Sequence, residues 1–106
     1  KTPFGIDCSG FTQMVYKING YKILRDAKDQ ATQGVTLSFI EESEPGDLAF
    51  FHNDNDEIIH VGIILKDNHI IHASGKVRID RLDQSGIYNN EKNMHTHTLR
   101  YIKKII

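Results

Sequence analysis

The stretch "EIIHVGIILKDNHIIHAS", residues 57–74, decides the fold because it holds two apolar runs on either side of a short polar segment. Both runs are rich in Ile and Val, which favour the pleated surface of a sheet, and turn-forming residues bound them. The pattern predicts two antiparallel strands, at residues 57–65 and 69–74, joined as a β-hairpin. Each strand carries one histidine inside its apolar run, His60 in the first and His72 in the second.

The turn of this hairpin determines whether the two histidines meet. If residues 66–68 form a three-residue loop, with Asn68 in the left-handed conformation that such loops need, His72 lies opposite Gly62. His60 is then its diagonal neighbour on the same face of the sheet, whereas a shift of one residue would separate the two imidazoles. We also expect Gly62 to leave an open patch between them, where the backbone of a substrate can approach.

The segments around the hairpin predict helices first and further strands afterwards. Asp7 as a cap, apolar residues at helical spacing and the Asn19-Gly20 pair predict a helix over residues 8–18. A polar stretch predicts a short second helix within residues 24–34. Further strands are predicted at residues 47–52, 77–82 and 97–105, with residues 83–96 as a polar connection. Helices followed by an antiparallel meander indicate the α+β class.

Length and charge restrict the classes of function. The chain has 106 residues, 39% of them hydrophobic, and a formal net charge of −1, which is typical of a single globular domain. This balance lacks the basic patch of a nucleic-acid-binding protein. No apolar run approaches the roughly 18 residues that a membrane-spanning helix needs. We therefore predict no nucleic-acid partner and no membrane span.

Cys8 is the only cysteine, and it stands at the start of the first predicted helix. The free N–H groups of a helix N-terminus favour a thiolate, so we expect a lowered thiol pKa and donors for an oxyanion. A cysteine nucleophile also needs a histidine that a third group holds in place, and His60 and His72 can supply both. The alternative is a buried apolar cysteine with two structural histidines.

The other histidines carry weaker signals than His60 and His72. We expect His95 and His97 to be solvated, in a loop and at the start of a strand. Zinc binding is a further alternative, because Cys8, His60 and His72 include three potential ligands. The sequence has no closely spaced metal motif, so the favoured interpretation includes no metal.

Four motifs, "GIDCSGFTQMVY", "PGDLAFF", "HVGIIL" and "IIHASG", occur in this order and together resemble the NlpC/P60 family of bacterial cell-wall cysteine peptidases. The resemblance implies a papain-like α+β core, in which an N-terminal nucleophile helix packs on an antiparallel β-sheet. It implies that Cys8 is the nucleophile, His60 the general base and His72 the residue that orients the base. It implies no cofactor.

The segment "LRDAKDQA", residues 24–31, is similar to members that cleave the γ-D-glutamyl–diamino acid bond of free murein peptides and that carry SH3-like domains upstream. In these members the residues matching Asp7 and Ser9 help to bind the free amino terminus of L-Ala. Arg25 is a candidate for a substrate carboxylate, with a structural salt bridge as the alternative. Ala27 stands where a substrate-binding serine is often found, which is a departure from the family pattern.

The resemblance also implies how the chain is organised and where it acts. Residues 1–106 are expected to form the NlpC/P60 catalytic domain at the C-terminal end of a longer protein, with the oxyanion tyrosine of the family upstream of Lys1. The expected substrates are peptidoglycan-derived peptides, in the bacterial cell envelope or outside the cell rather than in the cytoplasm. Two alternatives stay open: an amidase that cuts between the sugar lactate and L-Ala, and a catalytically inactive cell-wall-binding module.

Overall fold

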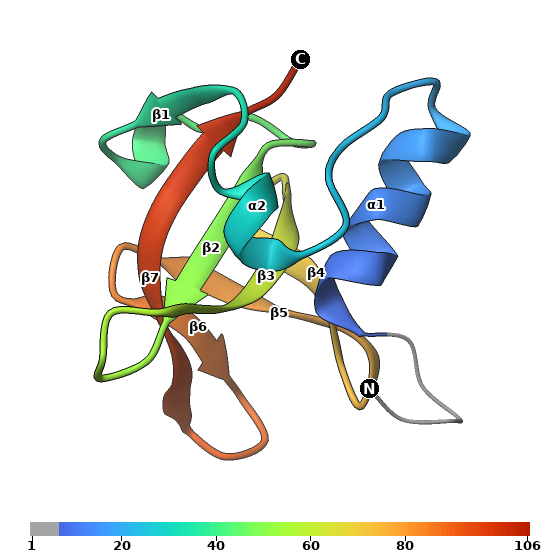
Figure 1. Cartoon of the computed structure of the whole chain (residues 1–106). Coiled ribbons are helices and arrows are strands. Elements are labelled where there is room, and N and C mark those ends of the chain that lie inside the picture. The colour runs from blue at the N-terminus through green and yellow to red at the C-terminus, as the bar shows by residue number, and fades with distance from the viewer. Residues whose placement is uncertain (1–6) are drawn as a thin grey trace.

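The computed structural model describes residues 7–106, which form a strand-rich body with two short helices on one side (Figure 1). The helices are α1 (Cys8–Ile18) and α2 (Ala27–Gln30), and a 3₁₀ turn spans Ile40–Glu42. The strands are β1 (Val35–Leu37), β2 (Leu48–His52), β3 (Ile58–Leu65), β4 (His69–Ser74), β5 (Lys76–Asp83), β6 (Gly86–Asn89) and β7 (Met94–Lys104).

The described strands close into an antiparallel barrel. Their order is β1-β7-β2-β3-β4-β5-β6, and β7 also pairs with β6, so that the last strand joins both ends of the meander. The prediction that residues 83–96 form only a polar connection was wrong, because this range contains β6 and the start of β7. β6 has four residues between turn-forming neighbours, which is too short to show an alternating pattern. Strand is therefore the most frequent element of the described chain, with less helix than the α+β prediction implied.

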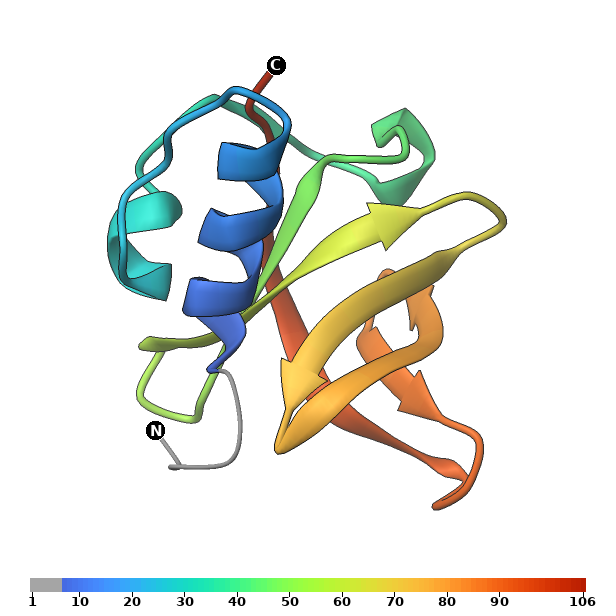
Figure 2. The ribbon, with the colours of Figure 1, turned by 90° about the vertical axis from the view of Figure 1, so that its right-hand side faces the viewer.

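The helices pack against one face of the sheet, and the opposite face lines the barrel (Figure 2). Alternation along each strand separates the two layers: in β2, Phe50 faces the helices and Phe51 faces the inside of the barrel. The helix-side core consists of Phe11, Tyr16, Ile23, Ala27, Ala31, Leu48, Phe50, Val61, Ile63 and Ala73. The barrel core consists of Ile40, Ala49, Phe51, Ile64, Ile70, Leu82, Ile87 and Ile102.

The register of β3 and β4 confirms the hairpin prediction. Gly62 pairs with His72, and the turn contains Asn68 at φ 58°. His60 and His72 therefore share the barrel-facing side of the sheet. The expectation of an open patch at Gly62 was wrong, because a Cβ atom there would lie 2.6 Å from Cδ1 of Ile70 and 3.0 Å from Cβ of His72. The missing side chain lets its neighbours pack closely and leaves no room for a substrate.

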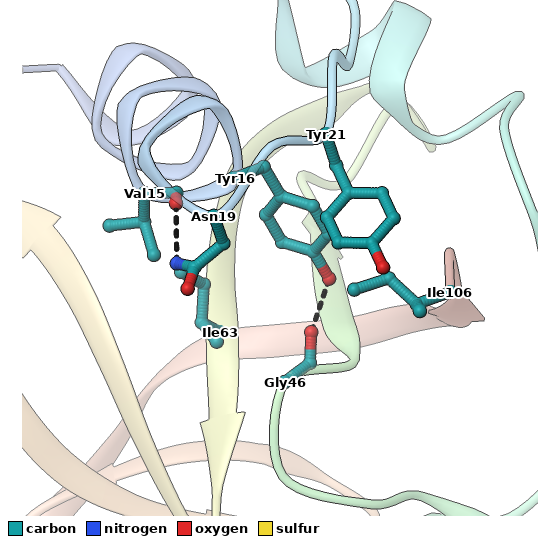
Figure 3. Close-up of a pocket in the computed structure, with 7 residues that line it drawn as sticks. All are labelled: Val15, Tyr16, Asn19, Tyr21, Gly46, Ile63 and Ile106. Atoms are coloured by element: carbon teal, nitrogen blue, oxygen red, sulfur yellow. Dashed lines mark hydrogen bonds between the residues drawn. The ribbon is translucent and has the colours of Figure 1, made fainter.

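The helix that carries Cys8 is fixed at both ends. At its start, the Asp7 carboxylate accepts a hydrogen bond of 2.7 Å from the Gly10 N–H, which confirms the predicted cap. At its other end, the Tyr16 hydroxyl donates to the carbonyl of Gly46, in the turn before β2 (Figure 3). The short second helix predicted within residues 24–34 is confirmed as a single turn.

We predict that Gly62→Ala destabilises the protein by about 1–3 kcal/mol, because the added methyl group overlaps Ile70 and His72 in a packed interior. Urea unfolding followed by circular dichroism measures the change. Ser74→Ala, at an exposed position at the end of β4, is the matched control and should leave the midpoint unchanged. Equal stability of both variants would contradict the close packing of the β3–β4 pair.

Candidate active site

Cys8 is the first residue of α1, and its side chain packs against the helix-side core. Burial raises the pKa of its thiol, and the nearby Asp7 carboxylate adds to the rise, although the backbone N–H groups of Val61 and Ser9 oppose it. The expected lowering of the thiol pKa by the helix N-terminus was therefore wrong in its net direction, because loss of hydration outweighs the backbone donors. The contact with Val61 places the sulfur beside the residue that follows His60.

His60 and His72 form a buried pair on the barrel-facing side of β3 and β4. Nε2 of His60 lies 2.8 Å from Nδ1 of His72, and the two rings meet edge to face with centroids 5.0 Å apart. Only 6% of His60 and 1% of His72 is exposed to solvent. The rigid strands β3 and β4 hold both backbones, so the imidazoles keep this geometry without help from a mobile loop.

Asp80 is joined to this pair by a hydrogen bond to His72. Asp80 was not identified from the sequence as a residue of the site. Its Oδ2 lies 2.7 Å from Nε2 of His72, and the Arg78 guanidinium binds both carboxylate oxygens, at 2.8 and 3.1 Å. Arg78 also reaches Glu91 at 2.9 Å. Burial alone would raise the pKa of Asp80, but the hydrogen bonds from Arg78 and His72 outweigh it and hold that pKa below its usual value. Asp80 is therefore a buried carboxylate with both oxygens occupied.

His97 is also part of the site, and the prediction that it is solvated was wrong. Its ring stacks on His60 with centroids 4.2 Å apart and an angle of 24° between the planes. It also contacts the rings of Phe51 and His72. The closing strand β7 brings it there, so local sequence holds no signal for the contact. His95 is exposed as expected and pairs with Asp83 at 2.8 Å.

The charges of the site at neutral pH follow from burial. Loss of hydration, with smaller contributions from His97 and His72, lowers the pKa of His60 to about 3. Burial lowers the pKa of His72 despite the neighbouring Asp80 carboxylate, and it lowers the pKa of His97 to about 4. The thiol of Cys8 and the imidazole of His60 are thus both neutral, so attack by this thiol on a substrate would require transfer of its proton at the same time.

Asp7, Ser9 and Arg25 form a second cluster beside the start of α1. Arg25 donates to Oδ2 of Asp7 at 2.7 Å and to Oγ of Ser9 at 2.9 Å. A Cβ atom at Gly10 would lie 2.5 Å from Asp7, so glycine is needed for this arrangement. The guanidinium thus binds the two residues that flank Cys8. Of the two roles considered for Arg25, a substrate contact and a structural salt bridge, this geometry corresponds to the salt bridge.

Gln30, at the end of α2, connects this cluster to the rest of helix α1 and to the segment before Arg25 by hydrogen bonds. Its side chain is fully buried and donates to the carbonyls of Ser9 at 3.0 Å and Leu24 at 2.7 Å. It accepts from the Thr12 hydroxyl at 2.8 Å. These bonds connect the segment before Arg25 to the first turn of the helix that carries Cys8. Ala27, on the same short helix, is buried in the helix-side core.

The remaining expectations concern metals, membranes and the upstream residues. Among residues 7–106, no group of three or more His, Cys, Asp or Glu side chains has the arrangement of a metal site. Within the same range, no helix has the length and apolar character to cross a bilayer. The expected oxyanion tyrosine and the domain start at Lys1 lie outside the described residues.

We predict that the free energy of unfolding decreases as the pH is lowered below about 6.5. In this range the unfolded chain binds a proton at His60, whereas the folded chain does not bind it until about pH 3. The unfolded state binds more protons in this window, so His60 alone contributes a slope of up to about 1.4 kcal/mol per pH unit. Urea midpoints measured from pH 7.5 to 4.5 should decline less steeply in His60→Gln. Parallel slopes in the wild type and His60→Gln would contradict the prediction.

A family model described as "NlpC/P60 family" matches residues 1–98 of this chain. The γ-D-glutamyl-L-lysine dipeptidyl-peptidase of Bacillus subtilis (strain 168) is 40% identical over 72 residues, which cover 66% of this chain and 24% of that protein. The crystal structure of an NlpC/P60 family protein from Bacillus cereus ATCC 10987 superposes with a TM-score of 0.76 at 29% identity, over 96% of this chain and 32% of that chain. The chain thus spans about a quarter of the length of the first relative and about a third of the second.

A third comparison shows the fold alone. RipD of Mycobacterium tuberculosis, described as a non-catalytic NlpC/p60 domain protein adapted to peptidoglycan binding, superposes with a TM-score of 0.72 at 20% identity, over 96% of this chain and 68% of that chain. The match of the family model over nearly the whole chain and the shared papain-like fold lead to one conclusion: the chain belongs to the NlpC/P60 family.

Proposed function

We propose that this protein is a cysteine peptidase of bacterial peptidoglycan, and that it hydrolyses the γ-D-glutamyl–diamino acid bond of stem peptides with a free N-terminal L-Ala. One observation carries the proposal: Cys8 begins a helix and contacts the backbone of Val61, next to a buried His60–His72 pair joined by a hydrogen bond of 2.8 Å. A nucleophile, a base and a group that orients the base are the parts that cysteine hydrolysis requires.

The reaction follows from the neutral charges of these residues. His60 removes the thiol proton as the Cys8 sulfur attacks the γ-glutamyl carbonyl, and the backbone N–H of Cys8 stabilises the oxyanion. The imidazolium of His60 then protonates the leaving amine, and a thioester forms between Cys8 and the glutamyl group. A water molecule, deprotonated by His60, hydrolyses the thioester and restores the thiol. Burial opposes the charge on His60, so the imidazolium exists only during the reaction.

The Asp7–Ser9–Arg25 cluster supports the choice of a substrate with a free amino terminus. The Asp7 carboxylate lies next to the nucleophile, and an ammonium group of the substrate would add a favourable charge pair. Arg25 holds the carboxylate and the Ser9 hydroxyl in fixed positions. In this proposal Arg25 orients two substrate-binding side chains and does not itself bind a substrate carboxylate.

The setting of the activity is part of the same proposal. Peptidoglycan peptides occur in the bacterial cell envelope or outside the cell, and we place the protein there. The chain would serve as the catalytic domain of a longer protein with SH3-like domains upstream, and a tyrosine from the upstream segment would complete the oxyanion site. The relative named γ-D-glutamyl-L-lysine dipeptidyl-peptidase supports this choice of bond.

We predict that Cys8→Ala lowers turnover of L-Ala-γ-D-Glu-diamino acid peptides by more than about 10³-fold, because no other group can form the thioester. Mass spectrometry of products from defined muropeptides measures the reaction. The control Met14→Ala, on the exposed side of the same helix, should keep full activity. Release of intact stem peptide from the sugar would instead identify an amidase, and unchanged turnover in Cys8→Ala would identify a module without this catalytic role.

We predict that Arg25→Gln raises KM several-fold for peptides with a free amino terminus and changes kcat little, because Asp7 and Ser9 lose their common donor. N-acetylated peptides should show a smaller change in KM, since they lack the ammonium group. Lys28→Gln, which removes an exposed positive charge from the adjacent helix, is the control. An equal rise in KM for free and acetylated peptides would contradict the role assigned to Arg25.

A further inference from the structure

We propose that Asp80 is a positioning residue of the active site: through His72 it sets which nitrogen of His60 carries the proton, and so leaves His60 Nδ1 as the acceptor for the Cys8 thiol. The kinetic consequence rests on the proposed peptidase function, whereas the proton positions do not. The inference follows from the donors and acceptors along one row of buried side chains, Arg78, Asp80, His72 and His60.

The row has a fixed direction because one end can only donate. Arg78 has N–H donors and no acceptor, and it binds both oxygens of Asp80. This contact keeps Asp80 ionised, and an ionised carboxylate can only accept. Asp80 is 8% exposed, so water does not compete freely for its oxygens. The Asp80 Oδ2 atom at 2.7 Å from His72 Nε2 therefore requires a proton on that nitrogen.

The same requirement passes from His72 to His60. A neutral imidazole carries one N–H, so a proton on Nε2 of His72 leaves Nδ1 as a lone pair. That lone pair lies 2.8 Å from Nε2 of His60, which must therefore donate. With its proton on Nε2, His60 has a free lone pair on Nδ1. The opposite direction would place a lone pair of His72 against the Asp80 carboxylate, which is unfavourable in a buried site.

The arrangement separates positioning from catalysis. His72 by itself can donate or accept through Nδ1, so the pair His60–His72 leaves the tautomer of the base open. Asp80 removes this choice, and it also favours the imidazolium that forms on His60 during attack, through the polarised His72 ring. Asp80 touches neither the sulfur nor the substrate, and its effect on the reaction passes through His72.

Nitrogen-15 NMR of the histidine side chains near neutral pH tests the proton positions without any substrate. Two-bond couplings identify the protonated nitrogen of each ring, and His60→Gln and His72→Gln assign the signals. We expect a proton on Nε2 and none on Nδ1 in both rings of the wild type. A proton on Nδ1 of His72 in the wild type would overturn the proposal, whether or not the protein is an active peptidase.

Asp80→Asn tests the effect of the carboxylate, because an amide keeps the shape but offers one donor and one acceptor. We expect a population of His72 with the proton on Nδ1 and a fall in kcat of about 10²- to 10⁴-fold, the scale seen when a catalytic histidine is held in the wrong tautomer. KM should change little, since no substrate contact is lost. Asp83→Asn is the matched control, because it removes an exposed acid of the same strand that pairs with His95.

The outcomes separate the possible failures. If Asp80→Asn keeps the wild-type tautomers and loses no more kcat than Asp83→Asn, the proposal is wrong. If the wild type hydrolyses no muropeptide but the tautomers shift as expected in Asp80→Asn, the positioning role stands and the proposed function fails. Thermal unfolding shows whether Asp80→Asn is folded, and if it is not, the wild-type spectrum decides.

Discussion

The candidate active site depends on the register between β3 and β4, which places His72 opposite Gly62 and so brings His60 and His72 within hydrogen-bond distance. A shift of one residue would turn one imidazole to the helix side of the sheet and destroy the pair. The register also requires glycine at position 62, because the side chains of Ile70 and His72 fill the space of its missing Cβ atom. The same residue pairing therefore determines both how the barrel interior packs and where the imidazole of the candidate base lies.

Burial gives this site its chemical character. It raises the pKa of the Cys8 thiol and lowers that of His60, so the resting pair is neutral. An ion pair would need more compensation than the N–H groups of Val61 and Ser9 supply against the loss of hydration. The charge that burial does admit is at Asp80, where Arg78 and His72 occupy the carboxylate oxygens. A fixed negative group thus lies two hydrogen bonds away from His60, the proposed base.

Much of the site could be predicted from local sequence. The start of α1 at Cys8 follows from the Asp7 cap, and the common face of His60 and His72 follows from a period of two and a short loop. Asp80 and His97 could not be found in this way. In β5 the apolar residues Val77 and Ile79 are exposed while Asp80 is buried, which reverses the usual alternation. A buried carboxylate in such a strand is stable only because Arg78 and His72 meet it from neighbouring positions.

The sequence by itself determined the local parts of this protein: the capped helix with its cysteine, the hairpin with its two histidines and the family motifs that connect them. These features depend on residues close together in the chain, where spacing and turn chemistry decide geometry. Only the tertiary structure decided that β7 returns to close the barrel, and with it that His97 stacks on His60. The tertiary structure also decided that the pKa of Cys8 is raised. Burial causes this rise, and burial depends on what the rest of the chain packs around a group and not on its sequence neighbours.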